Sequence, residues 1–446
     1  MGDGRREYFA ARMVRRSFGP LMVCLLSLAG FGQQSDPAHA NSTLTLVQAE
    51  TIAVANQPRI LAARLRARAA AERVRQTHAA LLPTAAFNAT GVRVADTGTS
   101  TAAGALTTSS LSDRFAYGGN IVQMVTDFGR TSALIASSRA SENAQQDAAT
   151  LTTAQVKLDV REAYFEVLGA EAVLRAAREA QANRHLISHQ IGALAASQLR
   201  STLDVNFAGV LESQAELAVV RAQSTVEQQR VHLATAMGLQ EPISASLVDV
   251  PLPAQLAPDA GALLPEADAQ RADLNESQSQ QQAAAQFAKA EKRLSYPTLN
   301  ALGAAGQIPF RDHTLHDSYA AAGFNLNIPV FNGGLFASRR AEADLEATAR
   351  SRDMDELKLE VNEQVRDDWY KANEAFQTLD VSARLVAQSR EALRLAQARY
   401  NAGLGSIVEL NEAQLNETSA EIDSADATYS YLARRAELDY AIGLLN

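Results

Sequence analysis

Cysteine is almost absent from this 446-residue chain, which contains only Cys24. A single cysteine excludes an intramolecular disulfide framework. Cys24 lies in a short apolar stretch near the N-terminus, and Val23 before it is bulkier than the small residue that normally precedes a lipid-anchor cysteine. That neighbour argues against lipidation of Cys24.

Long apolar runs and basic runs are also missing. Beyond the N-terminus no segment has about 18 consecutive apolar residues, so we expect no transmembrane helix. The formal net charge is -9, and basic residues cluster only at the extreme N-terminus. This balance argues against a nucleic-acid partner, because nucleic-acid binding proteins present basic surfaces to phosphates.

The residue patterns of enzymes are missing as well. No order of Ser, His and Asp suggests a nucleophile, and the glycine pairs 118–119 and 333–334 lack the spacing of a phosphate or dinucleotide loop. His185 and His189 have helical i, i+4 spacing, but no third metal ligand accompanies them. We therefore expect no enzyme, no cofactor and no resident metal.

Residues 1–40 have the pattern of an export signal peptide. Five arginines between Arg5 and Arg16 precede the apolar segment Leu21 to Phe31, which is too short to span a bilayer. Ala38-His39-Ala40 then fits a small-x-small cleavage site, so we expect the mature chain to begin at Asn41. The chain is therefore expected to leave the cytoplasm.

Proline is absent from two long stretches, and both have apolar residues at helical spacing. They predict helices from Gly129 to about Ala196 and from Leu335 to about Tyr400. At 1.5 Å per residue each would be roughly 100 Å long. A second helix follows each of them, Leu203–Met237 and Ser406–Ile442. The predictions are two helical hairpins, 129–238 and 334–443.

Two segments change from helical spacing to a period of two, which predicts β-hairpins at 84–127 and 298–330. In the first, a polar Thr- and Ser-rich loop is expected from Asp96 to Ser112. In the second, Phe324, Leu326, Ile328 and Val330 are expected on one face of a strand. A helix from Thr43 to Asn56 opens the first half, and a helix from Asp268 to Leu294 opens the second.

The chain is internally duplicated at an offset of 205 residues. Val156 and Val160 match Val361 and Val365, and the turn residues Leu199 and Ser201 match Leu404 and Ser406. We predict a first repeat at 41–239, a Pro-rich linker at 240–265 and a second repeat at 266–446.

Two hairpins supply about four strands, whose faces alternate apolar and polar as in outer-membrane barrels. Four strands cannot close a barrel, and open edges are not tolerated in lipid, so several chains would have to share one barrel. The alternative is a pair of soluble hairpins on a helical body, which fits a structural coiled-coil protein of the periplasm.

The sequence resembles the TolC-type outer-membrane efflux protein family over essentially all of its expected mature length. The most specific stretch is Tyr400-Asn401-Ala402-Gly403-Leu404-Gly405-Ser406-Ile407-Val408-Glu409, which resembles the second hairpin tip of the family. Val330-Phe331-Asn332-Gly333-Gly334 and Asp127-Phe128-Gly129 resemble its strand-to-helix junctions.

The resemblance implies a mostly helical fold with a small β part and a defined assembly. Three copies would form a twelve-stranded β-barrel in the outer membrane that continues as a tunnel of long antiparallel helices across the periplasm. The homotrimer would be a passive conduit for efflux or type I secretion. A periplasmic adaptor would join it to an inner-membrane pump of the RND or ABC type, which supplies the energy.

The resemblance also implies site residues at the hairpin tips. Tyr400 and Asp204 match the tyrosine and aspartate that meet across the periplasmic gate, and Glu409 and Glu412 match acidic positions at the tunnel entrance. The adaptor-docking positions correspond to Leu199, Ser201, Gly403, Leu404, Gly405 and Ser406.

Two tip positions depart from the family pattern. Gly405 stands where some members have an arginine, and Gln198 replaces the usual tip glycine of the first half. Each proposed role has a plainer alternative: Tyr400 as helix-end packing, and Asp204, Glu409 and Glu412 as first-turn acids that interact favourably with a helix dipole.

Overall fold

The computed structural model describes residues 43–93, 98–101, 108–111, 114–198, 200–253, 256–310 and 316–446. The predicted signal peptide, residues 1–40, lies outside these ranges and stays a prediction.

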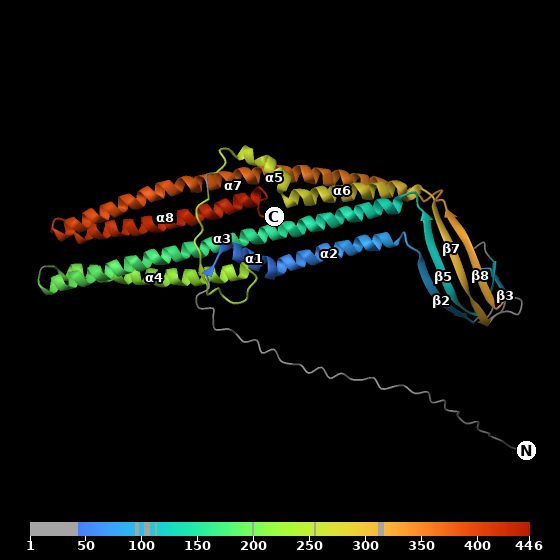
Figure 1. The fold of residues 1–446 in the computed structure, drawn as a ribbon, viewed down its shortest axis with the longest axis horizontal. Helices are drawn as coiled ribbons and strands as arrows, with labels where there is room; N and C mark the ends of the chain where they lie inside the picture. The colour runs from blue at the N-terminus through green and yellow to red at the C-terminus, as the bar shows by residue number, and fades with distance from the viewer. Residues whose placement is uncertain are drawn as a thin grey trace, which may run out of the picture.

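Two helices of 67 residues, α3 (Arg130–Ala196) and α7 (Leu335–Asn401), run along most of the elongated molecule (Figure 1). Each begins after a glycine with positive φ, Gly129 at 89° and Gly334 at 84°. Glycine adopts this left-handed conformation at little cost, so the chain can turn sharply from a strand into a helix at both places. Both long helices were predicted from the absence of proline, and the structure confirms them.

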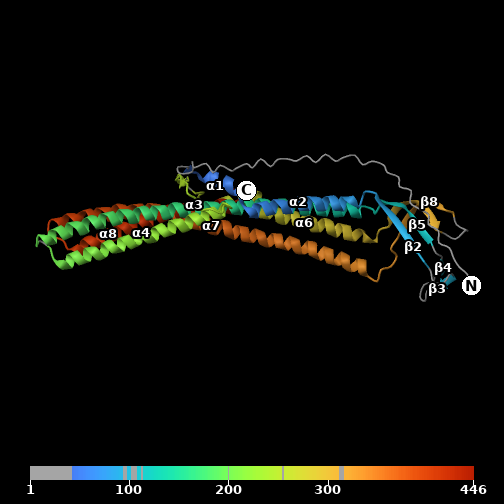
Figure 2. The same ribbon diagram turned by 90° about the horizontal axis from the view of Figure 1, so that it is seen from below.

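Shorter helices accompany the long ones in pairs. α2 (Pro58–Ala79) and α4 (Thr202–Ala236) pack on α3, while α6 (Ala272–Lys292) and α8 (Ile407–Ala441) pack on α7. Within each pair the helices lie end to end beside the long helix (Figures 1 and 2). In the centre α3 contacts both α6 and α8. The packed helices, here called rods, therefore lie in the order α2-α3-α6-α7 in the half of the molecule next to the strands (the upper rods). They lie in the order α4-α3-α8-α7 in the half that ends in the hairpin tips (the lower rods).

The end-to-end junctions are built alike in the two halves. After α4, Gly238 has φ +73°, and a Cβ added there would lie 2.9 Å from Gln57 Cα. Gln57 ends α1 (Leu46–Asn56) and donates through Nε2 to the α4 carbonyls of Thr235 (3.1 Å) and Ala236 (2.9 Å). The side-chain amide thus satisfies carbonyls that lack partners at a helix C-terminus.

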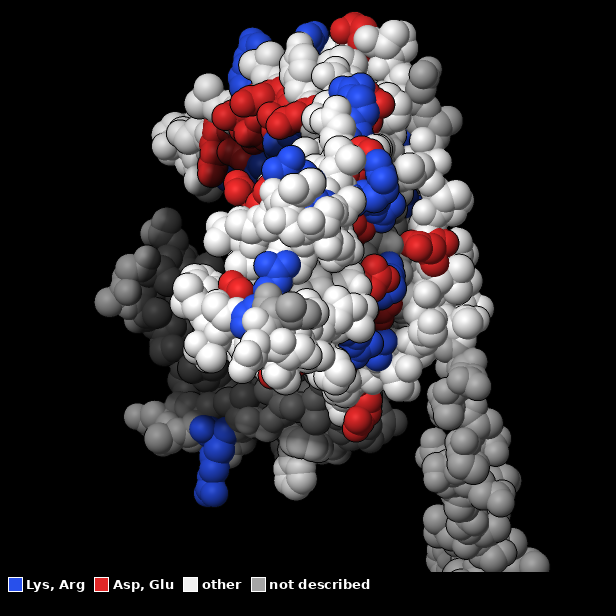
Figure 3. All heavy atoms as spheres, turned by 90° about the vertical axis from the view of Figure 1, so that its left-hand side faces the viewer, with Lys and Arg blue, Asp and Glu red and all other residues white. Residues whose placement is uncertain are grey.

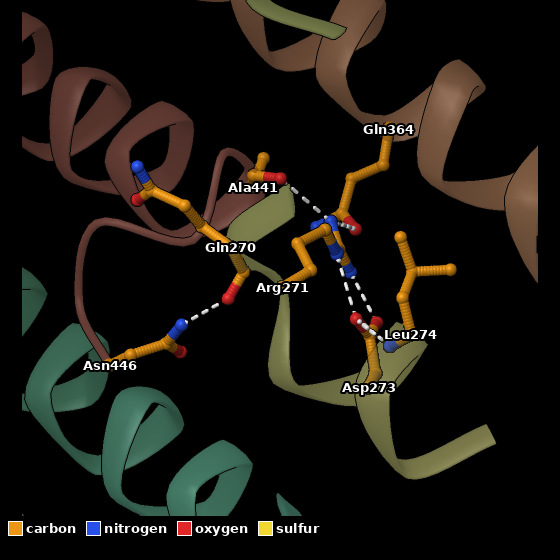
Figure 4. Close-up of polar contacts among 7 residues, drawn as sticks. All are labelled: Gln270, Arg271, Asp273, Leu274, Gln364, Ala441 and Asn446. Carbon is orange, nitrogen blue, oxygen red and sulfur yellow. Dashed lines mark hydrogen bonds and ion pairs between the residues drawn. The ribbon is translucent and has the colours of Figure 1, made fainter. Parts of the chain in front are cut away.

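In the second half Arg271 occupies the corresponding place, between α5 (Leu264–Gln270) and α6. Its guanidinium donates to the α8 carbonyl of Ala441 (2.9 Å), to Gln364 (2.9 Å) and to both oxygens of Asp273 (3.0 and 2.6 Å) (Figure 4). We expected a continuous helix from Asp268 to Leu294, which is wrong. The break has no proline to mark it, and Arg271 instead turns in an extended conformation.

Short elements, among them β1 (Thr43–Leu44), β6 (Ser246–Leu247), α1 and α5, pack at the middle of the rods, and we call them the collar. β1 pairs in parallel with β6, so the expected helix from Thr43 begins only at Leu46, capped by Thr45. Tyr164 of α3 is fully buried there and donates to the Leu44 carbonyl at 2.8 Å. This ladder joins the N-terminal segment to the linker and could not be read from either two-residue strand alone.

Four antiparallel strands form a sheet at the end of the rods opposite the hairpin tips, in the order β2-β5-β7-β8 (Figure 1). They are β2 (Thr84–Val92), β5 (Arg114–Thr126), β7 (Thr298–Phe310) and β8 (Ser318–Asn327). The expected loop from Asp96 to Ser112 contains a separate two-stranded ribbon, β3 (Gly98–Thr101) with β4 (Thr108–Leu111). β8 ends at Asn327, before the expected Val330, because Pro329 has no N–H to donate to a ladder.

The two faces of the sheet differ in polarity. The cross-strand register places Phe87, Ile121 and Phe324 on one face, where all three are exposed. The opposite face carries asparagines, and Asn88 donates to Asn120 at 2.7 Å. Separately, none of the helices in the described part of the chain combines the length and hydropathy needed to cross a membrane.

Candidate functional site

The first hairpin tip joins α3 to α4 through a strained turn. Gln198 has φ +61°, a left-handed conformation that costs an L residue with a side chain roughly 1–2 kcal/mol. Ser201 then caps α4, its hydroxyl accepting from Asp204 N at 3.2 Å while the Asp204 carboxylate accepts from Ser201 N at 3.3 Å. This reciprocal pair is a capping box. The predicted tip residue Leu199 lies outside the described residues.

The second tip joins α7 to α8 with glycine where the first has glutamine. Gly403 has φ +72°, and the N–H groups of Leu404 and Gly405 donate back to the Arg399 carbonyl at 2.9 and 3.1 Å. Ser406 caps α8 by accepting from Glu409 N at 3.1 Å, as the sequence predicted. The two tips therefore share one design, with a helix stop at positions 198 and 403 and a serine cap three residues later.

An arginine of the first tip stacks on the tyrosine of the second. Arg200 Cζ lies 4.4 Å from the centroid of the Tyr400 ring, and its Nη2 donates to the Tyr400 carbonyl at 3.4 Å. Tyr400 is only 5% exposed and packs with Ala396, Leu410 and Ala413. A cation over an aromatic face is an attractive contact, so Arg200 and Tyr400 tie the two hairpins of one chain together.

The expected bond between Tyr400 and Asp204 is not formed within the described chain. The Tyr400 hydroxyl is buried and has no hydrogen-bond partner among the described residues, and Asp204 is held in its own capping box. Burial raises the pKa of Tyr400, and the nearby Asp204 charge raises it further while Arg200 lowers it. Asp204 is therefore a neighbour of the ring, and the inter-hairpin contact is made by Arg200, which the sequence did not single out.

The two predicted tunnel acids differ in their surroundings. Glu409 accepts from Arg399 Nε at 3.0 Å, so its charge is partly compensated inside the tip. Glu412 is exposed and forms no ion pair with any described residue. The structure therefore gives Glu412 the freer negative charge of the two, a difference that spacing alone could not reveal.

The tips also expose apolar side chains. Leu404 is 73% exposed and Val408 59% exposed on the second hairpin, and Leu203 is 63% exposed on the first. Ser201, Gly403 and Ser406 lie between them and are exposed too, while Gly405 is half-buried. Small residues beside exposed apolar ones permit a helical partner to approach closely.

A group of carboxylates lies along the rods, at a distance from the hairpin tips. Burial raises the pKa of Glu162 on α3 to about 7, and the charges of Glu437, Asp159 and Glu166 add to the effect. Burial likewise raises the pKa of Asp368 on α7. Seen from the tip end, acidic side chains gather in a hollow in the upper part of the molecule, on the side where α7 and α8 lie (Figure 3).

A protein-family model described as "Outer membrane efflux protein" matches residues 51–239 and 263–444. The chain belongs to this family. The match in two segments agrees with the internal duplication, and the predicted family and fold class are confirmed. Membership agrees with the expected outer-membrane location, and also with the expectation of transport rather than enzyme chemistry.

Curated relatives of this efflux-family chain match it over limited stretches. It is 24% identical over 152 residues to the outer membrane protein TolC of Escherichia coli K12, which covers 34% of this chain and 30% of TolC. It is 25% identical over 124 residues to TolC of Salmonella enteritidis, covering 28% and 25% respectively. The alignments thus span less than a third of either relative.

Solved structures extend the likeness over most of the efflux-family chain. The outer-membrane channel OprN superposes with a TM-score of 0.76 at 20% identity, covering 89% of each chain. VceC of Vibrio cholerae gives 0.74 at 18% identity, covering 89% of this chain and 96% of VceC. The open state of MtrE of Neisseria gonorrhoeae gives 0.73 at 20% identity, covering 89% and 88%. Likeness at this identity shows a common fold.

One histidine of the predicted pair in this efflux-family chain, His185, joins two helices. His185 Nδ1 lies 2.5 Å from Glu212 Oε1 and joins α3 to α4, just as Arg390 joins α7 to α8 through Glu421 at 2.7 Å. Residues 185 and 390 are separated by the repeat offset of 205. Among the described residues no group of three or more His, Cys, Asp or Glu side chains could hold a metal ion.

Proposed function

We propose that three copies of this chain form a passive efflux channel through the outer membrane and the periplasm. An inner-membrane pump of the RND or ABC type would drive transport, and a periplasmic adaptor would join pump and channel. One observation carries the proposal: in the described part of the chain, the sheet, the upper rods and the lower rods all have edges without a partner, and these edges lie on the same two sides.

The sheet has its unpartnered edges at β2 and β8. In lipid, unpaired backbone N–H and C=O groups are too costly, so a spanning sheet must close on itself. β7 has 13 residues and β8 has 10, which is enough for tilted strands of about 9–11 residues to cross a bilayer. Three copies would pair β8 of one with β2 of the next and give a closed barrel of twelve strands.

The rods have matching edges. α2 and α4 lie at one side and α7 at the other, and in the described chain no substantial contact joins them. Their outer faces carry exposed apolar residues, among them Phe207 and Val220 on α4 and Val381 and Leu395 on α7. Because all three layers present their edges in the same order, one rotation axis closes the barrel and the tunnel together.

We propose that the tips form the periplasmic gate of this channel. Arg200 and Tyr400 hold the two hairpins of each copy together, and Asp204 supplies a negative charge close to both. Opening would require the hairpins to part, which removes the stacked contact. This assignment keeps the predicted gate residues Tyr400 and Asp204 and adds Arg200 to them.

We propose further that Glu409 and Glu412 form acidic rings near the tunnel entrance, one copy of each from every subunit. Rings of carboxylates favour cations over anions. The E409A/E412A double variant should lose cation preference in single-channel recordings in planar bilayers. R399A should gain it, because that change frees Glu409 from its 3.0 Å partner. Selectivity unaltered in both variants would remove these acids from the tunnel wall.

The exposed tip residues are proposed to dock the adaptor. Leu404 and Val408 offer apolar surface, and Gly403 and Ser406 leave room for a close helical contact. Crosslinking from Ser406→Cys to co-purified periplasmic proteins tests this role, with an exposed position far from the tips, Val47→Cys on α1, as the control.

Membrane fractionation tests the function as a whole. The channel should be recovered with the outer membrane, migrate as a heat-sensitive trimer and conduct ions in planar bilayers. Recovery of a soluble monomer after osmotic shock would instead favour the alternative, a periplasmic coiled-coil protein.

A further inference from the structure

Helix α2 is strongly basic, although the chain as a whole is acidic. Its 22 residues include six arginines and a single glutamate, Glu72. Ile60, Ala63 and Ala70 are buried against the neighbouring rods, and Leu65 on the opposite side is 62% exposed. Arg68 is exposed close to Leu65 and forms no ion pair with any described residue. On the outer edge of α2, the exposed Leu65 is therefore surrounded by positively charged side chains.

The outer edge of α7 carries the opposite charge. Between Glu342 and Glu363 the helix as a whole has eight carboxylates and three basic side chains, and three exposed carboxylates, Asp355, Glu356 and Glu363, lie three or four residues from Leu359 on the outer side. Ala343, Val361 and Val365 are buried on the inner side, while Leu359 on the outer side is 72% exposed. An exposed leucine among carboxylates complements the exposed leucine among arginines.

Contacts inside one chain fix the relative heights of the two edges. Thr77 of α2 lies 3.0 Å from Ser138 of α3, and the adjacent Ser137 donates to the Ala283 carbonyl of α6 at 2.8 Å. Eight residues farther along α6, Glu291 pairs with Arg339 of α7 at 2.9 Å. Because α6 and α7 run antiparallel, Ala283 is level with residue 347, and so is Thr77.

The same count of residues along antiparallel helices places Leu65 and Leu359 at one height along the rods. α2 and α7 also run antiparallel, so stepping back twelve residues from Thr77 and forward twelve from residue 347 reaches Leu65 and Leu359. Both helices rise 1.5 Å per residue, so the match does not depend on length. A rotation axis along the rods keeps these heights, so they also hold between neighbouring copies.

We infer that α2 of one copy docks on α7 of the next in the register that sets Leu65 against Leu359. The inference rests on the trimer proposed above and specifies its upper seam. The occupant of the basic edge is thus a second copy of this chain, chosen by the complementary charge of α7 and the shared height of the two leucines.

In this register the charges form one alternating row. Glu72 comes level with Arg352 of the neighbour, and Arg68 comes level with Glu356, beside Asp355. Within each copy Glu72 already pairs with Arg75 at 2.6 Å, and Arg352 with Asp355 at 2.9 Å. Docking would therefore join two existing pairs and add Arg68 at the end, giving Arg75, Glu72, Arg352, Asp355 and Arg68 in sequence. Flanking ion pairs of this kind set register and orientation in helix pairs.

Disulfide trapping tests the register directly, because two cysteines bridge only when their Cα atoms lie within about 7 Å. With Cys24 changed to serine, the chain has no other cysteine. The Leu65→Cys/Leu359→Cys variant should form covalent oligomers on mild oxidation of native outer membranes. The matched variants Leu65→Cys/Asp355→Cys and Leu65→Cys/Glu363→Cys, each one helical turn away, should remain uncrosslinked.

Charge reversal supplies a second readout. R68E should lower the temperature at which the unboiled trimer dissociates in gels. R73E is the control, because Arg73 is also exposed but comes level with Ser351 rather than with a carboxylate. A trimer that crosslinks at 355 or 363 instead, or that melts unchanged in R68E, would overturn this register and leave the channel standing.

Two further outcomes would also overturn the inference. Loss of binding to phosphatidylglycerol vesicles in R68E, with unchanged trimer melting, would assign the arginines to lipid headgroups. Absence of any trimer in the unmodified chain would instead refute the proposed channel itself.

Discussion

Removing the Arg200 guanidinium should open the channel. A cation–π contact contributes about 0.5–1 kcal/mol when exposed and about 2 kcal/mol when desolvated. Tyr400 is 5% exposed and Arg200 is half-buried, so we take about 1 kcal/mol for each copy. If the three copies open together, R200A should favour the open state by about 3 kcal/mol, which is roughly a 100-fold change in the closed-to-open ratio.

Single-channel recording in planar bilayers measures this change. R200A should spend far more time in high-conductance states than the unmodified channel. R200K should lie between the two, because lysine keeps the charge but loses the planar group that stacks on the ring.

The matched control is Y400F. It keeps the ring beneath Arg200 and removes only a hydroxyl that has no partner within the described chain. Y400F should therefore remain closed. If Y400F opened the channel as far as R200A does, a hydrogen bond from Tyr400, such as the one to Asp204 implied by the family, would hold the gate and the cation–π argument would fail.

Three further predictions concern stability. Q198G should stabilise the assembly by about 1 kcal/mol for each copy, because it relieves the φ of +61° at the first tip, and should therefore raise the dissociation temperature. Q198A should not raise it. Glu162 keeps its proton up to a pKa of about 7 in the fold, against an ordinary value of 4.5, so stability should fall as pH rises between these values. E162Q should flatten that part of a pH–melting curve, and an unchanged slope would assign it to other groups. R271A should cost about 3–5 kcal/mol in denaturant unfolding, because it leaves the Asp273 carboxylate, 16% exposed, without its cation. R340A, at an exposed pair, should change stability by less than about 0.5 kcal/mol.

Much of the fold could be predicted because its signals are local. Runs without proline predicted α3 and α7, the alternation around Phe324 predicted a strand, and Gly403 predicted the second tip. These features depend on backbone preferences within a few residues, which a single sequence displays directly.

The parts that were missed depend on contacts between distant segments. The break at Arg271 is stabilised by the carbonyl of Ala441, 170 residues away, and the β1–β6 pair joins segments about 200 residues apart. At the tips, the sequence pointed to Asp204 as the partner of Tyr400, whereas in the structure the Asp204 carboxylate accepts from Ser201 N and the Arg200 guanidinium lies over the Tyr400 ring. Arg200 carried no distinguishing signal beyond its position in the turn.

The junctions at Gly238 and Gly443 determine which parts of the molecule are mechanically continuous. α3 and α7 run through the collar without interruption, whereas α4 and α8 merely abut the helices above them. A pull on the tips can therefore move α4 and α8 about these two junctions without breaking any hydrogen bond within a helix, while α3 and α7 follow the movement by bending. Bending that is spread along two 67-residue helices becomes small near the strands, so the pore in the lipid need not change shape when the distant tips move apart.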